Sequence, residues 1–201
     1  MINAIDFAAF VGLTAVVLLT LNILLGLLVS TNYNPAKQWP RRKLPWPLFR
    51  IHNWAGYIAL AVVCLHPVSL LFIHSKDGQQ VFGVRDVLLP VWSHEQTAFN
   101  ILGGLAFYGF VLVVVTSYLR PKLGYRPWKK LHYTAYFAAA MMFLHGTLID
   151  QNLKNATPDY LDGEKVLIEG CFLLVLAASV WRWRRGTEKQ RRLAAKAQSA
   201  A

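Results

Sequence analysis

Five long apolar segments dominate the chain, and short polar stretches separate them. They lie at Phe7 to Ser30, Ile51 to Ile73, Thr97 to Leu119, Leu131 to Ile149 and Val166 to Trp183. Because the hydrocarbon core of a bilayer takes about 20 helical residues, each segment is long enough to form a transmembrane helix. The pattern predicts an all-α polytopic membrane protein, a helical bundle with five membrane-spanning helices.

Composition agrees with a membrane domain. The 201 residues are 55% hydrophobic and only 15% charged, which fits one domain rather than two. We expect a transmembrane domain over residues 1–185 and a basic cytoplasmic tail over residues 186–201. The first segment lacks a basic leader, follows Asp6 and exceeds the usual apolar core of a signal peptide, about 7 to 15 residues, so it is interpreted as a permanent helix.

The positive charges alternate from loop to loop. The net charge is +11, and 17 of the 21 Lys and Arg residues follow the first, third and fifth segments. By the positive-inside rule these stretches face the cytoplasm, which places the amino terminus outside and the carboxyl terminus inside a bacterial inner membrane. Topology and contact with anionic lipid account for the basic excess, so no nucleic-acid partner is expected.

Four histidines form two pairs inside the apolar segments. His52 and His66 are fourteen residues apart in the second segment, and His132 and His145 are thirteen apart in the fourth. Neutral imidazole is a good axial ligand for haem iron, and two such ligands favour electron transfer over oxygen binding. The predicted topology makes the two segments run in the same direction, which matches His52 with His132 near the inner ends and His66 with His145 farther out.

Helix geometry supports one interval better than the other. At about 1.5 Å per residue the intervals separate two haem levels by about 20 Å. Fourteen residues return a side chain to within about 40° of its starting direction, but thirteen fall about 140° short. The fourth segment therefore requires a bend, a π-bulge or ligands that leave from different sides. The simpler alternative for any one histidine is a packing or proton-relay residue, and proton or metal transport without haem stays open.

Several motifs carry a family resemblance. Arg50-Ile-His52-Asn-Trp-Ala-Gly56 with Leu65-His66-Pro67, followed by Trp128-Lys-Lys-Leu-His132 and Leu144-His145, resemble the ferric-reductase-like transmembrane domain over residues 50–150. This superfamily includes ferric reductases, the membrane domain of NADPH oxidases and the haem-binding subunit of the bacterial methionine sulfoxide reductase system. The resemblance implies that His52, His66, His132 and His145 ligate two haems, and that the family uses the thirteen-residue interval.

The chain departs from larger members of that superfamily in two ways. Many have six spans where five are predicted here, and many append a flavin and nicotinamide domain where this chain has a short basic tail. The chain also contains no Gly-x-Gly-x-x-Gly or Gly-Lys-Ser/Thr loop, so a separate partner is expected to hold any flavin or nucleotide. Cys64 and Cys171 are isolated and no Cys-x-x-Cys-His occurs, so the haems are expected to be non-covalent b haems.

Other polar residues have weaker assignments. Arg50, Lys129 and Lys130 lie beside the inner histidines and can pair with haem propionates, although plain topology explains them equally well. His74 and His94 are candidates for binding a metal substrate, relaying protons at a quinone site or bonding to a propionate; the simpler alternative is a solvated surface histidine. Glu169 is a candidate for a proton or quinone site, and the alternative is a pair with Lys165. Gly56, Gly103, Gly104 and Gly109 can admit a macrocycle or allow close helix packing.

Together these features predict a di-haem b-type membrane cytochrome. We expect electrons to pass from a cytoplasmic-side flavoprotein or quinol to an external redox partner, with the chain acting as the electron-transfer component of an oxidoreductase. Three alternatives remain: a quinone-linked cytochrome b subunit of a dehydrogenase, a stand-alone reductase of metal or oxygen, and proton or metal transport without haem.

Overall fold

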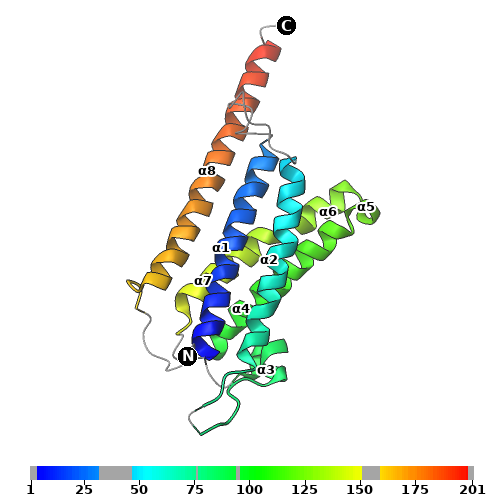
Figure 1. Ribbon diagram of the computed structural model, residues 1–201. Helices are drawn as coiled ribbons and strands as arrows, with labels where there is room; N and C mark the ends of the chain where they lie inside the picture. Colours follow the sequence, from blue (N-terminus) through cyan, green and yellow to red (C-terminus); the bar gives the residue numbers. More distant parts are fainter. Residues whose placement is uncertain (1–3, 32–46, 76, 94–95, 151–158, 199–201) are drawn as a thin grey trace.

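The computed structural model describes residues 4–31, 47–75, 77–93, 96–150 and 159–198, with side chains to residue 186. This part of the chain is almost entirely helical (Figure 1). The elements in order are α1 (Ala4–Ser30), α2 (Leu48–Leu70), α3 (Val84–Leu88), the 3-10 turn η2 (Pro90–Trp92), α4 (Thr97–Tyr118), α5 (Arg120–Leu123), α6 (Tyr125–His132), α7 (Thr134–Leu148) and α8 (Gly163–Gln198).

Four of the described helices are long and apolar enough to cross a membrane: α1, α2, α4 and residues 163–186 of α8. Their bounds agree with four of the five predicted segments to within a few residues, since the apolar runs set where each helix can lie in lipid. The all-α membrane fold is therefore confirmed. The prediction missed α3 and η2, which lie in the stretch between the second and third segments.

The remaining predicted segment, Leu131 to Ile149, is interrupted. Helix α6 ends at His132, Tyr133 forms a turn, and α7 then runs for 15 residues from Thr134. The Tyr133 amide is shared between the carbonyls of Lys129 and Lys130, each 3.3 Å away. Thirteen residues in one straight helix would leave His132 and His145 on different faces, and the interruption at Tyr133 lies between these two histidines.

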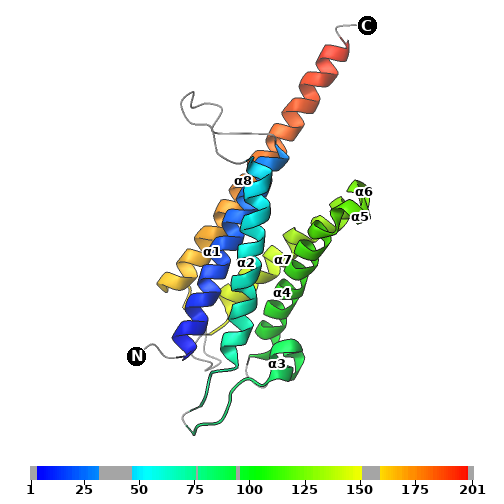
Figure 2. The same cartoon turned by 45° about the vertical axis from the view of Figure 1, so that its right-hand side comes forward.

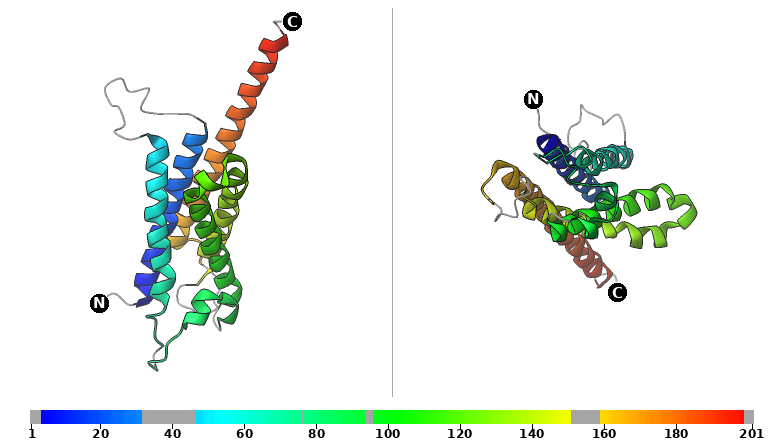
Figure 3. Two further views of the ribbon diagram at one scale, coloured as in Figure 1. Left: turned by 90° about the vertical axis from the view of Figure 1, so that its right-hand side faces the viewer. Right: turned by 90° about the horizontal axis from the view of Figure 1, so that it is seen from below.

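The helices form two antiparallel pairs. Helix α1 packs along α2, and α4 packs along α7, while α8 lies against α1 and α7. Figure 2 shows the α1–α2 pair standing beside α4 and α7, and Figure 3 shows the same arrangement from the side and along the bundle. Helix α2 also contacts α4, and this contact joins the two pairs.

Both the interior and the outer surface are apolar. Ala59, Val63, Phe143 and Ile168 are among the buried side chains that join the helices. Large apolar side chains are exposed along the spans, for example Phe10 at 68%. Extended exposed apolar surface is unfavourable in water, but it is what a surface in contact with lipid requires.

The basic stretches gather at one end of the bundle. Helices α5 and α6 lie toward the end at which α2 begins, and the carboxyl-terminal part of α8 projects past the other helices at that same end (Figure 1). The loop cations expected at residues 37–43 fall outside the described residues. Helix α8 continues without a break from the span into the predicted tail.

Candidate cofactor sites between the helix pairs

The structure brings His52 of α2 against His132 of α6. Their ring centroids are 6.3 Å apart and the ring planes are inclined by 81°. Two imidazoles that bind one metal ion from opposite sides, each at about 2 Å, have ring centres about 6 Å apart. The two rings, called here the first pair, are therefore spaced as axial ligands of one iron would be.

The second pair repeats this geometry fourteen residues along α2. His66 faces His145 of α7 with ring centroids 6.4 Å apart and planes inclined by 69°. The partners are those that the predicted topology assigned, since α2 and α7 run in the same direction. The interruption at Tyr133 lies between the two histidines that face α2.

Three of the four histidines have a backbone carbonyl as the partner of Nδ1. His52 Nδ1 lies 3.1 Å from the carbonyl oxygen of Asn22, His66 Nδ1 lies 3.0 Å from that of Ala8, and His145 Nδ1 lies 2.8 Å from that of Phe99. A carbonyl only accepts, so Nδ1 carries the proton and Nε2 carries the lone pair. Metal-binding histidines are typically oriented by such a bond from the other ring nitrogen.

A glycine lies against each of these three imidazoles. A Cβ added at Gly12 would lie 3.0 Å from the His66 ring, at Gly26 3.1 Å from the His52 ring, and at Gly103 2.9 Å from the His145 ring. Each glycine follows the bonded carbonyl by four residues, so the carbonyl and the glycine lie on the same helix face. Sequence reasoning found Gly103 but missed Gly12 and Gly26, although these two are fourteen residues apart, as are His52 and His66.

The other glycines that the sequence suggested have packing roles. A Cβ at Gly56 would meet Asn22, one at Gly104 would meet Pro90, and one at Gly109 would meet Ala138. Gly104 is the tightest, with 2.6 Å to the Pro90 ring. These positions let helices and the η2 turn approach closely, which is the packing alternative stated from the sequence.

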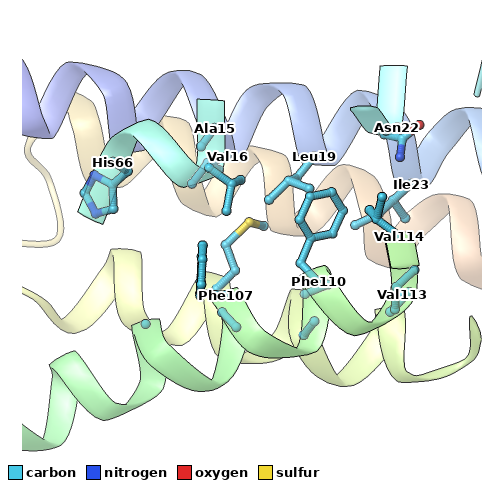
Figure 4. Close-up of a pocket in the computed structure, with 18 of the residues that line it drawn as sticks. Ala15, Val16, Leu19, Asn22, Ile23, His66, Phe107, Phe110, Val113 and Val114 are labelled. Carbon is cyan, nitrogen blue, oxygen red and sulfur yellow. The ribbon is translucent and has the colours of Figure 1, made fainter. Parts of the chain in front are cut away.

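A cavity of about 810 Å³ connects both pairs. All four histidines line it, together with apolar side chains of α1, α4 and α7. Figure 4 shows His66 toward one end of this lining and Asn22 toward the other, with Val16 and Leu19 of α1 facing Phe107 and Phe110 of α4. The cavity is mostly apolar, which suits a large flat hydrophobic cofactor.

Cations line the cavity near the first pair. Lys129 is among the lining residues, as are Arg120 and Arg182, which sequence reasoning did not single out. The Arg120 guanidinium lies 4.3 Å from the centre of the Trp128 ring, and Trp128 in turn packs on His132 with centroids 5.0 Å apart. Arg182 donates to the Tyr136 hydroxyl at 3.1 Å.

Arg50 and Lys130 lie elsewhere. Both side chains are exposed, and neither belongs to the residues that line the cavity. Of the three basic residues assigned to propionates from the sequence, the structure therefore brings only Lys129 to the cavity wall.

Two polar contacts hold the ends of α4 and α7 beside the second pair. The Gln96 amide donates to the Asp150 carbonyl oxygen at 2.8 Å, and the Asp150 N–H donates to Gln96 Oε1 at 2.7 Å. Lys165 is 5% exposed, and its Nζ donates to the carbonyls of Gly146 at 2.7 Å and Ile149 at 2.5 Å. A cation at the carboxyl end of a helix is stabilised by the free carbonyls there.

The remaining candidates from the sequence do not join the cavity. Lys165 bonds to α7 carbonyls, and half-buried Glu169 is not a lining residue. His74 is exposed, with Nδ1 3.0 Å from the Phe72 carbonyl oxygen, and His94 lies outside the described residues. Within the described ranges, no cluster of three or more His, Cys, Asp or Glu side chains occurs.

These features fit haem better than a metal held by protein ligands alone. Haem iron takes four ligands from the porphyrin and needs two from the protein, which is what each pair offers. The oriented Nε2 lone pairs, the glycines against the rings and the apolar cavity are consistent with that group. The fold and this geometry together describe an α-helical membrane protein with two histidine pairs that line one apolar cavity.

Comparison with known families names the class. The chain belongs to the ferric reductase like transmembrane component family, whose model matches residues 11–143. The match begins within α1, covers α2 and α4, includes three of the four paired histidines and ends two residues before His145. Domains of this family typically bind haem and take part in membrane electron transfer. No curated protein and no solved structure matches the chain significantly.

Proposed function

We propose that the chain is a di-haem b-type cytochrome that carries electrons across a membrane. The observation that carries the proposal is the pairing of His52 with His132 and of His66 with His145, at ring separations of 6.3 and 6.4 Å. Along α2 the two pairs are about 21 Å apart, which covers most of a hydrocarbon core about 30 Å thick. The α6–α7 unit acts as the fifth membrane segment in this proposal, although α7 alone is short.

The protein residues have defined tasks in this function. Bound haem supplies a one-electron carrier at each pair. The paired imidazoles would ligate the iron, and the carbonyls of Ala8, Asn22 and Phe99 keep three of the imidazoles in the tautomer that leaves Nε2 free to bind a metal. The apolar cavity wall excludes water, and Arg120, Lys129 and Arg182 give the propionates of the first haem cationic partners.

We assign the first pair to the cytoplasmic side. The basic stretches favour that orientation by the positive-inside rule, with the amino terminus outside in the inner membrane. Electrons then enter at the first pair from a separate flavoprotein or from quinol, and leave from the second pair to an external acceptor. The cations around the first pair suit an anionic donor, which makes a flavoprotein carrying a phosphorylated cofactor our preferred partner over quinol.

The test is the haem content of the purified chain and of four variants. We expect two haems per chain by pyridine haemochrome, and about one after replacing any paired histidine with alanine. His52→Ala and His132→Ala should remove the same haem in a redox titration, and His66→Ala and His145→Ala should remove the other. His74→Ala is the control, because His74 is exposed and outside the cavity.

Two results would overturn the proposal. Purified protein without a Soret band, despite adequate haem supply, would exclude haem altogether. Loss of different haems from His66→Ala and His145→Ala would show that the pairing is wrong.

A further inference from the structure

Ser117 of α4 occupies the place that glycine takes beside the other three histidines. His145 is flanked on α4 by the Phe99 carbonyl and Gly103. Fourteen residues farther along α4, the corresponding positions are Val113 and Ser117; Ser117 contacts His132 and also bonds to the Val113 carbonyl. The same order of carbonyl and small residue therefore occurs at all four histidines, but a hydroxymethyl group is inserted at this one.

The Ser117 hydroxyl makes three contacts. It donates to the Val113 carbonyl oxygen at 2.6 Å. Its oxygen also lies 3.2 Å from His132 Nδ1 and 3.3 Å from Trp128 Nε1. A hydroxyl has one hydrogen and two acceptor lone pairs, so these three contacts use its whole capacity.

This arrangement fixes the tautomer of His132. The Val113 carbonyl only accepts, so it takes the hydroxyl hydrogen, and the indole N–H of Trp128 only donates. The remaining lone pair of Ser117 must accept from His132, so Nδ1 of His132 carries the proton and Nε2 the lone pair. Ser117 thus does through a side chain what a backbone carbonyl does for the other three histidines.

We propose that Ser117 is a positioning residue: it holds the midpoint potential of the haem at the first pair above the value expected if a backbone carbonyl accepted the His132 N–H. This inference rests on the proposed di-haem function. The Ser117 hydroxyl accepts from two donors and lies 3.2 Å from His132 Nδ1. Its hydrogen bond to the imidazole N–H is therefore weaker than the bond that an amide carbonyl makes at 2.8 to 3.1 Å to the other histidines. The weaker bond leaves His132 a less basic ligand, which stabilises the ferric state less. Ser117 thereby sets the first haem apart from a glycine-type site.

Three substitutions at Ser117 test the proposal in the purified full-length chain loaded with haem. Visible redox titration measures both midpoint potentials, and low-temperature EPR reports the low-spin signal of the first haem. Ser117→Gly should lower the first potential, because His132 can then reach the Val113 carbonyl directly. Ser117→Ala should raise it and change the EPR signal, because the methyl keeps the ring away and offers no acceptor. Ser117→Thr retains a hydroxyl and should preserve the wild-type values.

Trp128→Phe provides an independent variant. It removes the competing donor, so the bond from His132 to Ser117 should strengthen and the first potential should fall. The second haem serves as an internal reference, and its potential should stay unchanged in all four variants.

The outcomes separate this inference from the proposed function. Wild-type protein without haem would contradict the proposed function itself. Two haems with unchanged potentials in the Gly, Ala and Thr variants would overturn only the role of Ser117. If Ser117→Ala loses the first haem, retention in Ser117→Thr supports the hydrogen bond, whereas loss in both shows that Ser117 matters through its size and overturns the proposal.

Discussion

The two histidine pairs have the same ring spacing but different surroundings. In the second pair, His66 and His145 both bond to backbone carbonyls and lie against glycines, Gly12 and Gly103. In the first pair, His132 depends on side chains, with Ser117 at its Nδ1 and Trp128 on its ring. Backbone carbonyls, whose positions follow from helix register, orient both histidines of the second pair. In the first pair, the side chains of Ser117 and Trp128 help to orient His132. Single substitutions should therefore adjust the first site more finely than the second.

Filling a glycine position should have the largest effect and should act on one pair only. Gly12→Val places a Cβ within 3.0 Å of the His66 ring, and Gly26→Val within 3.1 Å of the His52 ring. The rings must move off the ligating position, so we expect haem content to fall from two to about one per chain. Gly12→Val should remove the haem of the second pair and Gly26→Val that of the first, as measured by pyridine haemochrome with redox titration.

Gly170→Val is the matched control for both variants. It adds the same side chain to a membrane helix at a position where a Cβ meets nothing within 4 Å. Full haem content in all three variants would contradict the close approach of α1 to the histidines.

Removing the Lys165 amine should destabilise the second pair by a moderate amount. Lys165→Met leaves the carbonyls of Gly146 and Ile149 without their cationic donor, at a cost of about 1–3 kcal/mol. We expect a lower thermal unfolding midpoint in detergent and release of the second haem before the first. Lys130→Met, at an exposed site, is the control. Equal release of both haems would show that Lys165 does not act locally.

Removing a cation near the first pair should have the smallest effect. A nearby positive charge stabilises the reduced haem, which carries one more negative charge, so Arg120→Ala and Lys129→Ala should lower the first midpoint potential. A coupling of about 1 kcal/mol corresponds to about 40 mV for one electron. The second potential should not move, and Lys130→Ala should move neither. Equal shifts at both haems would indicate a general field rather than a local contact.

Most of the helical frame could be predicted from the sequence because lipid imposes length and hydrophobicity on each span. The bounds of α1, α2 and α4 follow from their apolar runs. The thirteen-residue interval also indicated that a straight helix would not suffice, and the break lies at Tyr133. Its position was not predictable, since Tyr133 is neither Pro nor Gly.

The parts that were missed depend on contacts between helices. The role of Gly12 and Gly26 beside the histidine rings depends on how α1 packs against α2. It can be recognised only when the antiparallel register of the two helices is known. Arg120 packs on Trp128 because the chain reverses between them at Gly124, whose φ of 77° is one that glycine adopts readily. The spacing of residues within a single helix predicts which of them share a face, but it does not show which neighbouring helix packs against that face.

Helix α1 couples the two sites through its length. The two carbonyls and two glycines that serve His66 and His52 are all spaced by the fourteen residues that separate those histidines. Deleting one residue of α1 between Gly12 and Gly26 would rotate one half of the helix by about 100° relative to the other. Both glycines could then no longer face their histidines at once. This stretch of α1 should therefore tolerate many apolar exchanges during evolution but no change in its number of residues.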